Sequence, residues 1–236
     1  MTDSPLACEA LVVGYGGRAL LPPITVAFGR GEFWAVVGRN GSGKTTWFKT
    51  MLGLMRPLSG QVSAQGARLS YVPQRTGYDD LWPVTAGDVV AMGLERGGSF
   101  FRPGPRLGVA DALAAVGATE LGGRPFRALS EGQKQRVLLA RVVASRADVV
   151  FLDEPTAAMD SVAEEEALTL LDDVRKRFGT TIVVVSHFLG VAREHADRVL
   201  FVDRPAQAVV VGTPDDVFTH PIFQSRYGRL AEPAHA

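Results

Sequence analysis

The sequence is poor in the features that mark secreted, membrane-spanning and nucleic-acid-binding proteins. Its one cysteine, Cys8, cannot form a disulfide within the chain, which suits a reducing compartment. Lysine plus arginine and aspartate plus glutamate both number 25, so no net charge attracts the chain to nucleic acid. The longest apolar runs, such as IVVV before Ser186, are too short to span a bilayer, and the N-terminal residues lack a secretory-signal pattern. We therefore expect a cytosolic protein that would need a partner to act at a membrane.

The chain is expected to fold as one domain, residues 1–236, of the α/β class. Its length of 236 residues allows it to bury a substantial core. Continuous Val/Ile/Leu-rich runs alternate with helical patterns, which is typical of a mainly parallel sheet covered on both faces. The predicted strands are 33–38, 68–73, 148–154 and 180–187, and the predicted helices are 44–55, 162–178 and one that follows Gln133.

The ends and the middle of the chain depart from this pattern. Residues 6–30 and 198–211 are predicted to form hairpins of shorter strands. We expect residues 75–128 to be a mostly helical insertion, with the Gly-, Pro- and Arg-rich loop 94–108 at its tip. Residues 212–236 then form a C-terminal tail.

The segment VVGRNGSGKTT, residues 36–46, follows a predicted strand and opens a predicted helix. It fits the pattern G-x-x-x-x-G-K-[ST] of a phosphate-binding loop. Glycines let backbone N–H groups surround phosphate oxygens, and the helix N-terminus adds partial positive charge. In such loops the lysine reaches the β- and γ-phosphates and the hydroxyl that follows it is a Mg²⁺ ligand. An incidental glycine turn would not explain the strand–loop–helix setting, so we predict that a nucleoside triphosphate is bound by Gly38, Arg39, Asn40, Gly41, Ser42, Gly43, Lys44, Thr45 and Thr46.

The segment VVFLDEP, residues 149–155, places two carboxylates at the carboxyl end of a predicted strand. In open parallel sheets ligands bind at that end, beside the phosphate loop. Asp153 would hold Mg²⁺ directly or through water, and Glu154 would be the general base that polarises the attacking water. Two solvated acids at a strand end are common by themselves. Their combination with the phosphate loop is what favours a hydrolytic site.

Four further polar or aromatic residues stand at strand ends or just before a helix. Gln74 has the reach to contact Mg²⁺ or the attacking water, and His187 has the chemistry to hydrogen-bond the γ-phosphate and orient Glu154. The ring of Tyr15 is suited to stacking on adenine. Asp160 by itself is a helix N-cap candidate. Each of these residues alone is more often an ordinary strand end or cap, so their interpretation depends on the combination.

The stretch RALSEGQKQRVLLAR, residues 127–141, suggests a helix start. Ser130 suits the N-cap, and Gln133 three residues later completes a capping box. Together with the other motifs, this stretch makes nearly the whole chain resemble the nucleotide-binding subunit of ATP-binding cassette (ABC) transporters. The motifs stand in that family's order: Tyr15, GRNGSGKTT, Gln74, LSEGQ, VVFLDEP, Asp160 and His187. LSEGQ then corresponds to the signature motif, which is usually LSGGQ.

The resemblance implies a fold, a cofactor and partners. The fold is a P-loop NTPase (RecA-like) core with an antiparallel β subdomain and an inserted α-helical subdomain. Two copies meet head to tail, so each Mg²⁺–ATP lies between one copy's phosphate loop and the other copy's Ser130, Gly132 and Gln133, at a helix end left open for phosphate. Asp160 is the crossing contact of this homodimer. The helical insertion binds a membrane permease at the cytoplasmic face of the inner or plasma membrane, and a substrate-binding protein acts indirectly.

One residue departs from the family pattern. Glu131 stands where the signature usually has its first glycine. Either its side chain points to solvent, or its negative charge weakens ATP-driven closure. In the second case, Glu131→Gly would raise ATPase activity.

The cargo is suggested by likeness alone. Residues 53–74, 81–94, 135–155 and 212–228 resemble the corresponding parts of zinc- or manganese-type importers, and iron-chelate importers share the tail. The histidines at positions 187, 195, 220 and 235 and Cys8 show no metal-ligand spacing. That is expected if the binding protein and permease select the cargo.

Two other classes of function compete with a transport ATPase. ABC ATPases of DNA repair or the ribosome usually carry long coiled-coil insertions or two cassettes, and this chain has neither. A small-molecule phosphotransferase would need an arginine lid, for which Arg96, Arg102 and Arg106 are candidates, but LSEGQ and His187 would then have no role. The sequence therefore favours an ATPase that powers the import of a metal ion.

Overall fold

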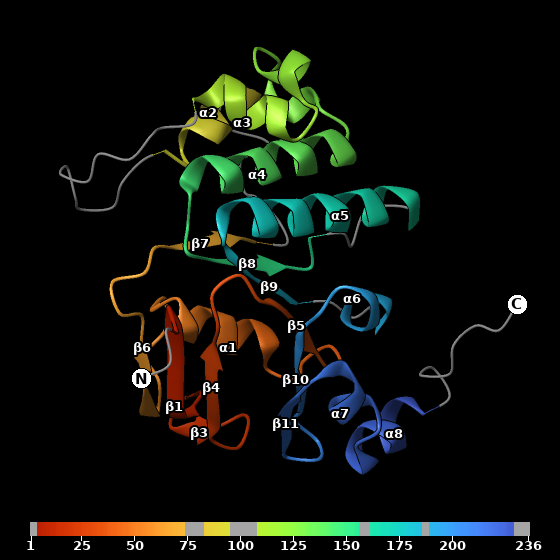
Figure 1. Ribbon diagram of the computed structural model, residues 1–236. Helices are drawn as coiled ribbons and strands as arrows, with labels where there is room; N and C mark the ends of the chain where they lie inside the picture. The colour runs from red at the N-terminus through yellow and green to blue at the C-terminus, as the bar shows by residue number, and fades with distance from the viewer. Residues whose placement is uncertain (1–3, 74–82, 95–107, 156–160, 186–188, 229–236) are drawn as a thin grey trace, which may run out of the picture.

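The computed structural model describes residues 4–73, 83–94, 108–155, 161–185 and 189–228 (Figure 1). Its central element is a six-stranded sheet with the order β11-β10-β5-β9-β8-β7. All neighbouring strands pair in parallel except β11, which runs antiparallel to β10. The strands are β5 (Phe33–Val37), β7 (Leu69–Val72), β8 (Val149–Asp153), β9 (Thr181–Val185), β10 (Arg198–Asp203) and β11 (Ala208–Gly212). The four predicted strands and the predicted C-terminal hairpin are therefore confirmed, except that β7 is a half-buried edge strand rather than a central one.

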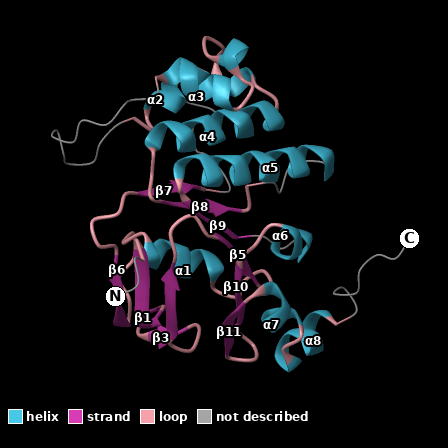
Figure 2. Ribbon diagram, viewed as in Figure 1, coloured by secondary structure: helices cyan, strands magenta, loops and turns pink. Residues whose placement is uncertain are grey.

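A second, antiparallel sheet packs beside the first. It has the order β4-β1-β6, formed by β1 (Leu6–Val12), β4 (Ile24–Phe28) and β6 (Ser59–Ser63). The hairpin predicted over residues 6–30 is present, and its turn carries a two-stranded ribbon of β2 (Gly14–Tyr15) and β3 (Arg18–Ala19). Helix α1 (Lys44–Met51) lies between the two sheets (Figures 1 and 2).

The helices on the other face of the parallel sheet belong to one continuous core. They are α2 (Ala86–Ala91), α3 (Val109–Ala115), α4 (Glu131–Ser145) and α5 (Ser161–Phe178), with 3₁₀ turns at Thr119–Leu121 and Phe126–Ala128. The described parts of the predicted insertion 75–128 are thus helical, as expected. Buried residues of α2 to α5 form one hydrophobic cluster with residues of β8 and β9. Residues 74–82 and 95–107 lie outside the described residues, and the division into subdomains stays a prediction.

Residues along β8 point alternately to the two faces of the sheet, as strand geometry requires. Val150 and Leu152 belong to the cluster with α4 and α5, whereas Val149 and Phe151 belong to the cluster with α1. Asp153 is the next odd-numbered residue, so its side chain comes out on the α1 face. This alternation sets up the candidate site.

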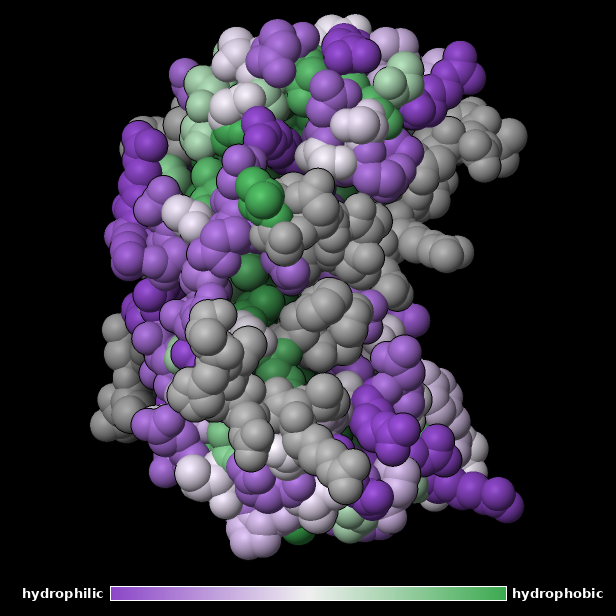
Figure 3. Space-filling model, turned by 90° about the vertical axis from the view of Figure 1, so that its right-hand side faces the viewer, coloured by the Kyte–Doolittle hydropathy of each residue, from purple (hydrophilic) through white to green (hydrophobic). Residues whose placement is uncertain are grey.

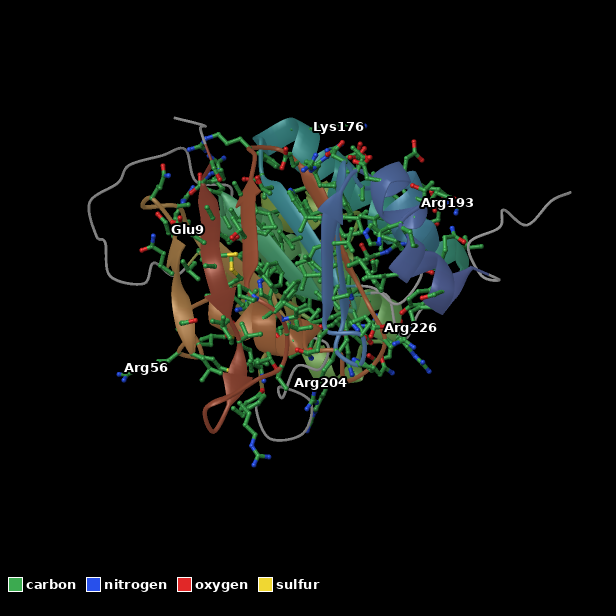
Figure 4. All side chains as sticks on the ribbon, turned by 90° about the horizontal axis from the view of Figure 1, so that it is seen from below. Glu9, Arg56, Lys176, Arg193, Arg204 and Arg226 are labelled. Atoms are coloured by element: carbon green, nitrogen blue, oxygen red, sulfur yellow. The ribbon has the colours of Figure 1, made fainter. Side chains whose placement is uncertain are left out.

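A third cluster fixes the C-terminal part of the chain against β5 and β10. It includes residues of α6 (Leu189–Glu194), α7 (Pro214–Phe218) and α8 (Pro221–Tyr227). The rings of Phe201 and Phe223 lie 5.2 Å apart, and Arg226 forms a 3.0 Å ion pair with the buried carboxylate of Asp203. The labelled charged side chains lie around the edge of the molecule, with carbon-rich side chains between the elements (Figure 4).

Two predicted helix bounds need correction. The helix predicted over 44–55 ends at Met51, because Gly53 adopts a φ of 71° and a Schellman motif closes the end. In it, the amides of Gly53 and Leu54 donate to the carbonyls of Thr50 and Lys49. The helix predicted to follow Gln133 begins earlier, at Glu131, because Ser130 is its N-cap.

Candidate nucleotide-binding site

The phosphate loop connects β5 to α1 through glycines with positive φ. The angle is 156° at Gly38, 76° at Gly41 and 101° at Gly43. A Cβ atom on Gly38 would lie 2.3 Å from the carbonyl oxygen of Val202 on β10, so no larger residue fits without movement of the backbone. A Cβ on Gly41 would meet no atom within 4 Å. The loop is therefore tight against the sheet and open on its outer side.

The N-terminus of α1 is free of protein capping groups. Its N-cap, Gly43, has no side chain to accept from the first-turn amides, which leaves them to another acceptor. The hydroxyl oxygen of Ser42 is buried and has no hydrogen-bond partner among the described residues. Buried donors of this kind call for an acceptor. Phosphate oxygens would supply it, so the residues present fit a nucleotide.

Lys44 brings a cation into this loop from the first position of α1. Its residue is 6% exposed, and Nζ donates to the carbonyl oxygens of Gly38 at 2.6 Å and Arg39 at 3.1 Å. Burial lowers the pKa of Lys44, and the charges of Glu154 and Asp153 act in the opposite direction. An ammonium held by neutral carbonyls in a buried place is stabilised when an anion joins it.

Asp153 meets the phosphate loop from the end of β8. Its Oδ2 accepts from the hydroxyl of Thr45 at 3.2 Å and from the hydroxyl of Tyr71 at 3.4 Å. Burial raises the pKa of Asp153, although the hydrogen bond from Thr45 acts against this rise. The hydroxyl of Thr45 and the carboxylate are hard oxygen donors side by side, the ligand type that Mg²⁺ takes. These residues therefore fit a magnesium ion.

Tyr71 is a member of the site that the sequence analysis missed. It lies on β7 directly beside Phe151 of β8, so the two side chains share the α1 face of the sheet. Burial and the charge of Asp153 raise the pKa of Tyr71 to about 12, so the phenol stays protonated and donates. The predicted strand 68–73 contained the signal, because a tyrosine hydroxyl in a buried strand needs a partner.

Glu154 turns the chain immediately after β8. Its φ of 49° lies in the left-handed region, which is uncommon for a residue with a side chain and is concentrated at functional sites. Its amide donates to the carbonyl of Val185, the last residue of β9, at 3.0 Å. The backbone of Glu154 is thus tied to the strand that leads towards His187 in the sequence. This left-handed backbone conformation ends the strand alternation that places Asp153 on the α1 face.

Tyr15 is attached to α1 and keeps its ring on the surface. Its hydroxyl and that of Thr46 lie 3.0 Å apart and share a hydrogen bond. The residue is nevertheless 56% exposed. This exposure leaves the Tyr15 side chain accessible for stacking on a base, while the hydroxyl is held by α1.

The signature segment, residues 129–133, forms the N-terminus of α4. The expectation that this helix end stays open is wrong in part, because a capping box closes it. The Ser130 hydroxyl accepts from the Gln133 amide at 3.3 Å, and the Gln133 side chain accepts from the Ser130 amide at 3.1 Å. The capping box makes no hydrogen bond to the amides of Glu131 and Gly132. A Cβ atom on Gly132 would meet no atom within 4 Å. Ser130, Gly132 and Gln133 line a surface hollow of about 450 Å³.

The phosphate loop and the signature segment lie on opposite faces of the parallel sheet. The helix after the loop packs with one hydrophobic cluster, and the helix after the signature packs with another (Figure 1). In the described part of the chain, no hydrogen bond or ion pair joins the two. One chain therefore presents two separate halves of the predicted site.

Residues 21–157 match the family described as ABC transporter. The chain is 35% identical to the zinc import ATP-binding protein ZnuC of Ruegeria pomeroyi, over 97% of this chain and 86% of the relative. It is also 35% identical to the manganese transport system ATP-binding protein MntB of Bacillus subtilis, over 95% of this chain and 92% of the relative. The chain belongs to the ABC transporter family. It is an ATP-binding subunit and an ATPase of that family.

Solved structures agree with this ABC ATPase fold. A metal-chelate type ABC transporter in an inward-facing conformation superposes with a TM-score of 0.81 at 27% identity, covering 94% of this chain and 88% of that one. CbiO1 of Clostridium perfringens, part of the transporter complex cbiONQ, gives 0.76 at 27% identity, covering 97% and 98%. The predicted family resemblance and P-loop fold are confirmed. No helix in the described ranges combines the length and apolar character that a bilayer crossing needs.

The structure of this ABC ATPase brings together some of the predicted site residues. Lys44, Thr45 and Asp153 are connected directly or through the loop carbonyls, with Tyr15 attached through Thr46. The predicted residues Gln74, Asp160 and His187 lie outside the described residues. Their roles stay predictions.

Proposed function

We propose that this ABC ATPase is the motor subunit of an importer of zinc or manganese ions. The support is the 35% identity, along almost the whole chain, to relatives named for zinc import and manganese transport. The ATPase hydrolyses ATP and passes the free energy to a permease on the cytoplasmic face of the membrane. A substrate-binding protein outside selects the ion.

The chemistry follows from the residues around the phosphate loop. The loop amides and Lys44 hold the β- and γ-phosphates, and Tyr15 stacks on the base. Thr45, Asp153 and Gln74 would hold Mg²⁺, which when bound would supply charge neutralisation at the phosphates. Glu154 accepts a proton from the attacking water, and His187 holds the γ-phosphate and orients Glu154. Burial of Lys44 strengthens its interaction with the phosphates because little water competes there.

We infer that two copies form a head-to-tail dimer around two ATP molecules. The observation that carries this inference is the pair of separate half-sites in one chain: a phosphate loop, open on its outer side, at one face and an exposed signature segment at the other. A two-fold dimer satisfies both at once, since loop meets signature twice. The amides of Glu131 and Gly132, which the capping box does not use, would then face the partner's γ-phosphate. Asp160 is the proposed crossing contact.

Mixing two inactive subunits tests this dimer. Lys44→Ala disables the phosphate loop of the subunit that carries it, and Ser130→Ala disables the signature segment of the subunit that carries it. A mixed dimer has one intact site and one site with both defects. If the two sites act independently, random mixing should restore about a quarter of the wild-type rate, because half of the dimers are mixed. A mixture as inactive as its components, with dimers present by light scattering, would contradict independent sites formed between subunits.

Cellular metal content tests the cargo. Cells without this gene, grown with a chelator, should lose zinc or manganese selectively by elemental analysis. Wild-type protein should restore the metal, and Glu154→Gln should not, because it keeps the nucleotide-binding residues and removes the base. Unchanged zinc and manganese would remove this cargo while leaving the ATPase intact.

A metal chelate is the second candidate cargo. It is favoured by the likeness to a metal-chelate type ABC transporter, at a TM-score of 0.81. The same cells would then keep their zinc and manganese and lose iron when an iron chelate is the sole iron source.

A further inference from the structure

Three side chains meet where α5 and α6 come together, although their positions in the sequence gave no metal-ligand spacing. Glu165 lies in the first turns of α5, Glu194 ends α6 and His195 follows it. One atom of each, two carboxylate oxygens and one imidazole nitrogen, lie within 4.8 Å of one another. None of the three belongs to the nucleotide site.

The imidazole of His195 is the member that requires explanation. Its Nε2 atom is buried and has no hydrogen-bond partner among the described residues. The carboxylate oxygen Oε1 of Glu165 lies 3.7 Å from it, beyond hydrogen-bond distance. A buried polar atom left in this way costs free energy unless another group satisfies it. Nitrogen and oxygen ligands bound to one zinc ion at about 2.1 Å lie about 3.4 Å apart, close to the separation found here.

The surroundings suit a cation that arrives from solvent. Both glutamates are exposed, and the Glu165 side chain is 60% exposed. In the described part of the chain, neither glutamate is paired with a lysine or an arginine. On the side of the molecule on which α6 lies in Figure 1, hydrophilic residues lie around several hydrophobic ones (Figure 3). Two negative charges and a neutral imidazole can therefore converge on an ion without displacing a basic residue.

The donor set selects the class of ion. Imidazole with carboxylates is a ligand set for zinc and similar first-row divalent metals, whereas Mg²⁺ and Ca²⁺ prefer oxygen ligands alone. We propose that Glu165, Glu194 and His195 bind a zinc ion that bridges α5 and α6, with water at the remaining position. The ion satisfies the buried nitrogen and fastens the end of α6 to α5.

The position of this zinc site gives it a use in the motor. In the sequence, α5 follows the segment with Asp160 and α6 follows the segment with His187. Occupancy of this site depends on the zinc concentration. A bound ion would therefore couple that concentration to the two helices that follow the Asp160 and His187 segments in the sequence. In an importer of zinc or manganese the site would be a sensor of the imported ion; this last statement rests on the proposed cargo.

Zinc binding to the full-length, metal-stripped protein tests the site. Competition with a chromophoric chelator should give one zinc per chain in the Asp153→Asn background, which disables the magnesium site. Glu165→Gln, Glu194→Gln and His195→Gln should each weaken binding about ten-fold or more, since even outer-shell changes at metal sites cost about that much. Glu166→Gln is the matched control, because its side chain is also 60% exposed but bonded to Arg136 at 2.8 Å. It should bind zinc like the parent protein.

Thermal unfolding provides a second measurement. Zinc should raise the unfolding midpoint of the parent and of Glu166→Gln, because it binds only the folded chain, and the same zinc concentration should raise that of the three ligand variants clearly less. Equal zinc affinity in the parent, Glu165→Gln and Glu194→Gln would overturn the site and leave only an ion pair between Glu165 and protonated His195. Both glutamate variants are at exposed positions, so this result does not depend on how His195→Gln folds. Unchanged zinc and manganese content in cells without this gene would remove the proposed cargo. That result would overturn the sensor role but not the zinc site itself.

Discussion

The phosphate loop and the signature segment differ in how complete each is within one chain. Around the loop, Lys44 and Asp153 are buried, and Gly38 has no room for a Cβ atom. At the signature, Ser130 is exposed, and Gly132 has open space where a side chain would be. The geometry of the loop is determined by contacts within its own chain. At the signature, Gly132 borders open space that no described residue of the same chain fills.

This difference shows what a sequence motif encodes in each case. The loop glycines are required by backbone geometry, since larger residues would strain or collide. Gly132 is compatible with any small residue in the isolated subunit, so its presence there points to something outside the subunit. Substitutions at the two places should therefore separate stability from activity.

The largest effect is expected from removing the loop's cation. Lys44→Ala should reduce ATP hydrolysis by about 10²–10³-fold or more, because a preorganised positive charge at the phosphates is lost. The ATPase rate at saturating Mg²⁺–ATP measures it. Lys49→Ala, on the same helix, is the control and should keep most of the activity. Similar losses in both variants would indicate that α1 is disrupted rather than that phosphate contacts are missing.

Alanine substitutions at Gly38 and at Gly132 should have opposite effects on the stability of the subunit. Gly38→Ala should cost about 2–4 kcal/mol of unfolding free energy, because its Cβ would collide with the Val202 carbonyl at a φ of 156°. Gly132→Ala should leave the subunit as stable or slightly more stable, since alanine favours helices. It should still lower ATP hydrolysis by about ten-fold, if a partner's nucleotide approaches it.

Chemical denaturation and ATPase assays on the same preparations measure both effects. A Gly132→Ala protein that is stable and fully active would mean that no ligand comes close to this glycine. A Gly38→Ala protein with wild-type stability would mean that β10 can move away from the loop.

Asp153→Asn should stabilise the ligand-free subunit while abolishing hydrolysis. Burial raises the pKa of Asp153 above that of the unfolded chain, so the stability linked to this carboxyl is present at low pH and lost as pH rises through its folded pKa. At neutral pH the variant should therefore unfold at a higher temperature than the wild type. Scanning calorimetry with EDTA measures the difference, which should shrink towards pH 4. A lower midpoint at neutral pH would show that the Thr45 and Tyr71 hydrogen bonds outweigh the cost of burial.

The smallest effect is expected at Glu131. Its side chain is 64% exposed and lies 2.9 Å from the Lys134 ammonium, which favours the solvent-facing interpretation and partly neutralises the carboxylate. Glu131→Gly should therefore change ATPase activity by less than about two-fold, since exposed ion pairs contribute little. Steady-state rates at low and moderate salt measure it. A clear rise in activity would instead support weakened closure.

Much of the fold was predictable because its signals are local. The apolar runs identified four strands of the parallel sheet: β5, β8 and β9, whose residues are all buried, and the half-buried edge strand β7. The loop motif identified the strand–loop–helix unit, and a correctly placed capping box was visible at Ser130 and Gln133. The predicted helix extended too far because the apolar pattern continues through Leu54 and Met55, whereas Gly53 ends α1 by adopting a φ of 71°.

Contacts between distant elements were harder to predict. Tyr71 joins Asp153 only because β7 pairs with β8 in a register that puts Tyr71 beside Phe151. Glu165 and His195 meet only because α5 and α6 lie together, and no spacing in the sequence records that. The expected open end at α4 was inferred from the family, and the hydrogen bonds of the capping box corrected it.

The sequence by itself determined the family, the α/β class and the phosphate-binding residues, since each depends on residue types at short, fixed spacings. The tertiary structure decided which side chains meet across strands and helices. It put Asp153 on the face of α1 through the two-residue period of β8, separated the two half-sites on opposite faces of the sheet, and left the nitrogen of His195 buried beside two carboxylates. These outcomes depend on strand register and helix packing, and both are set by the whole core rather than by any segment.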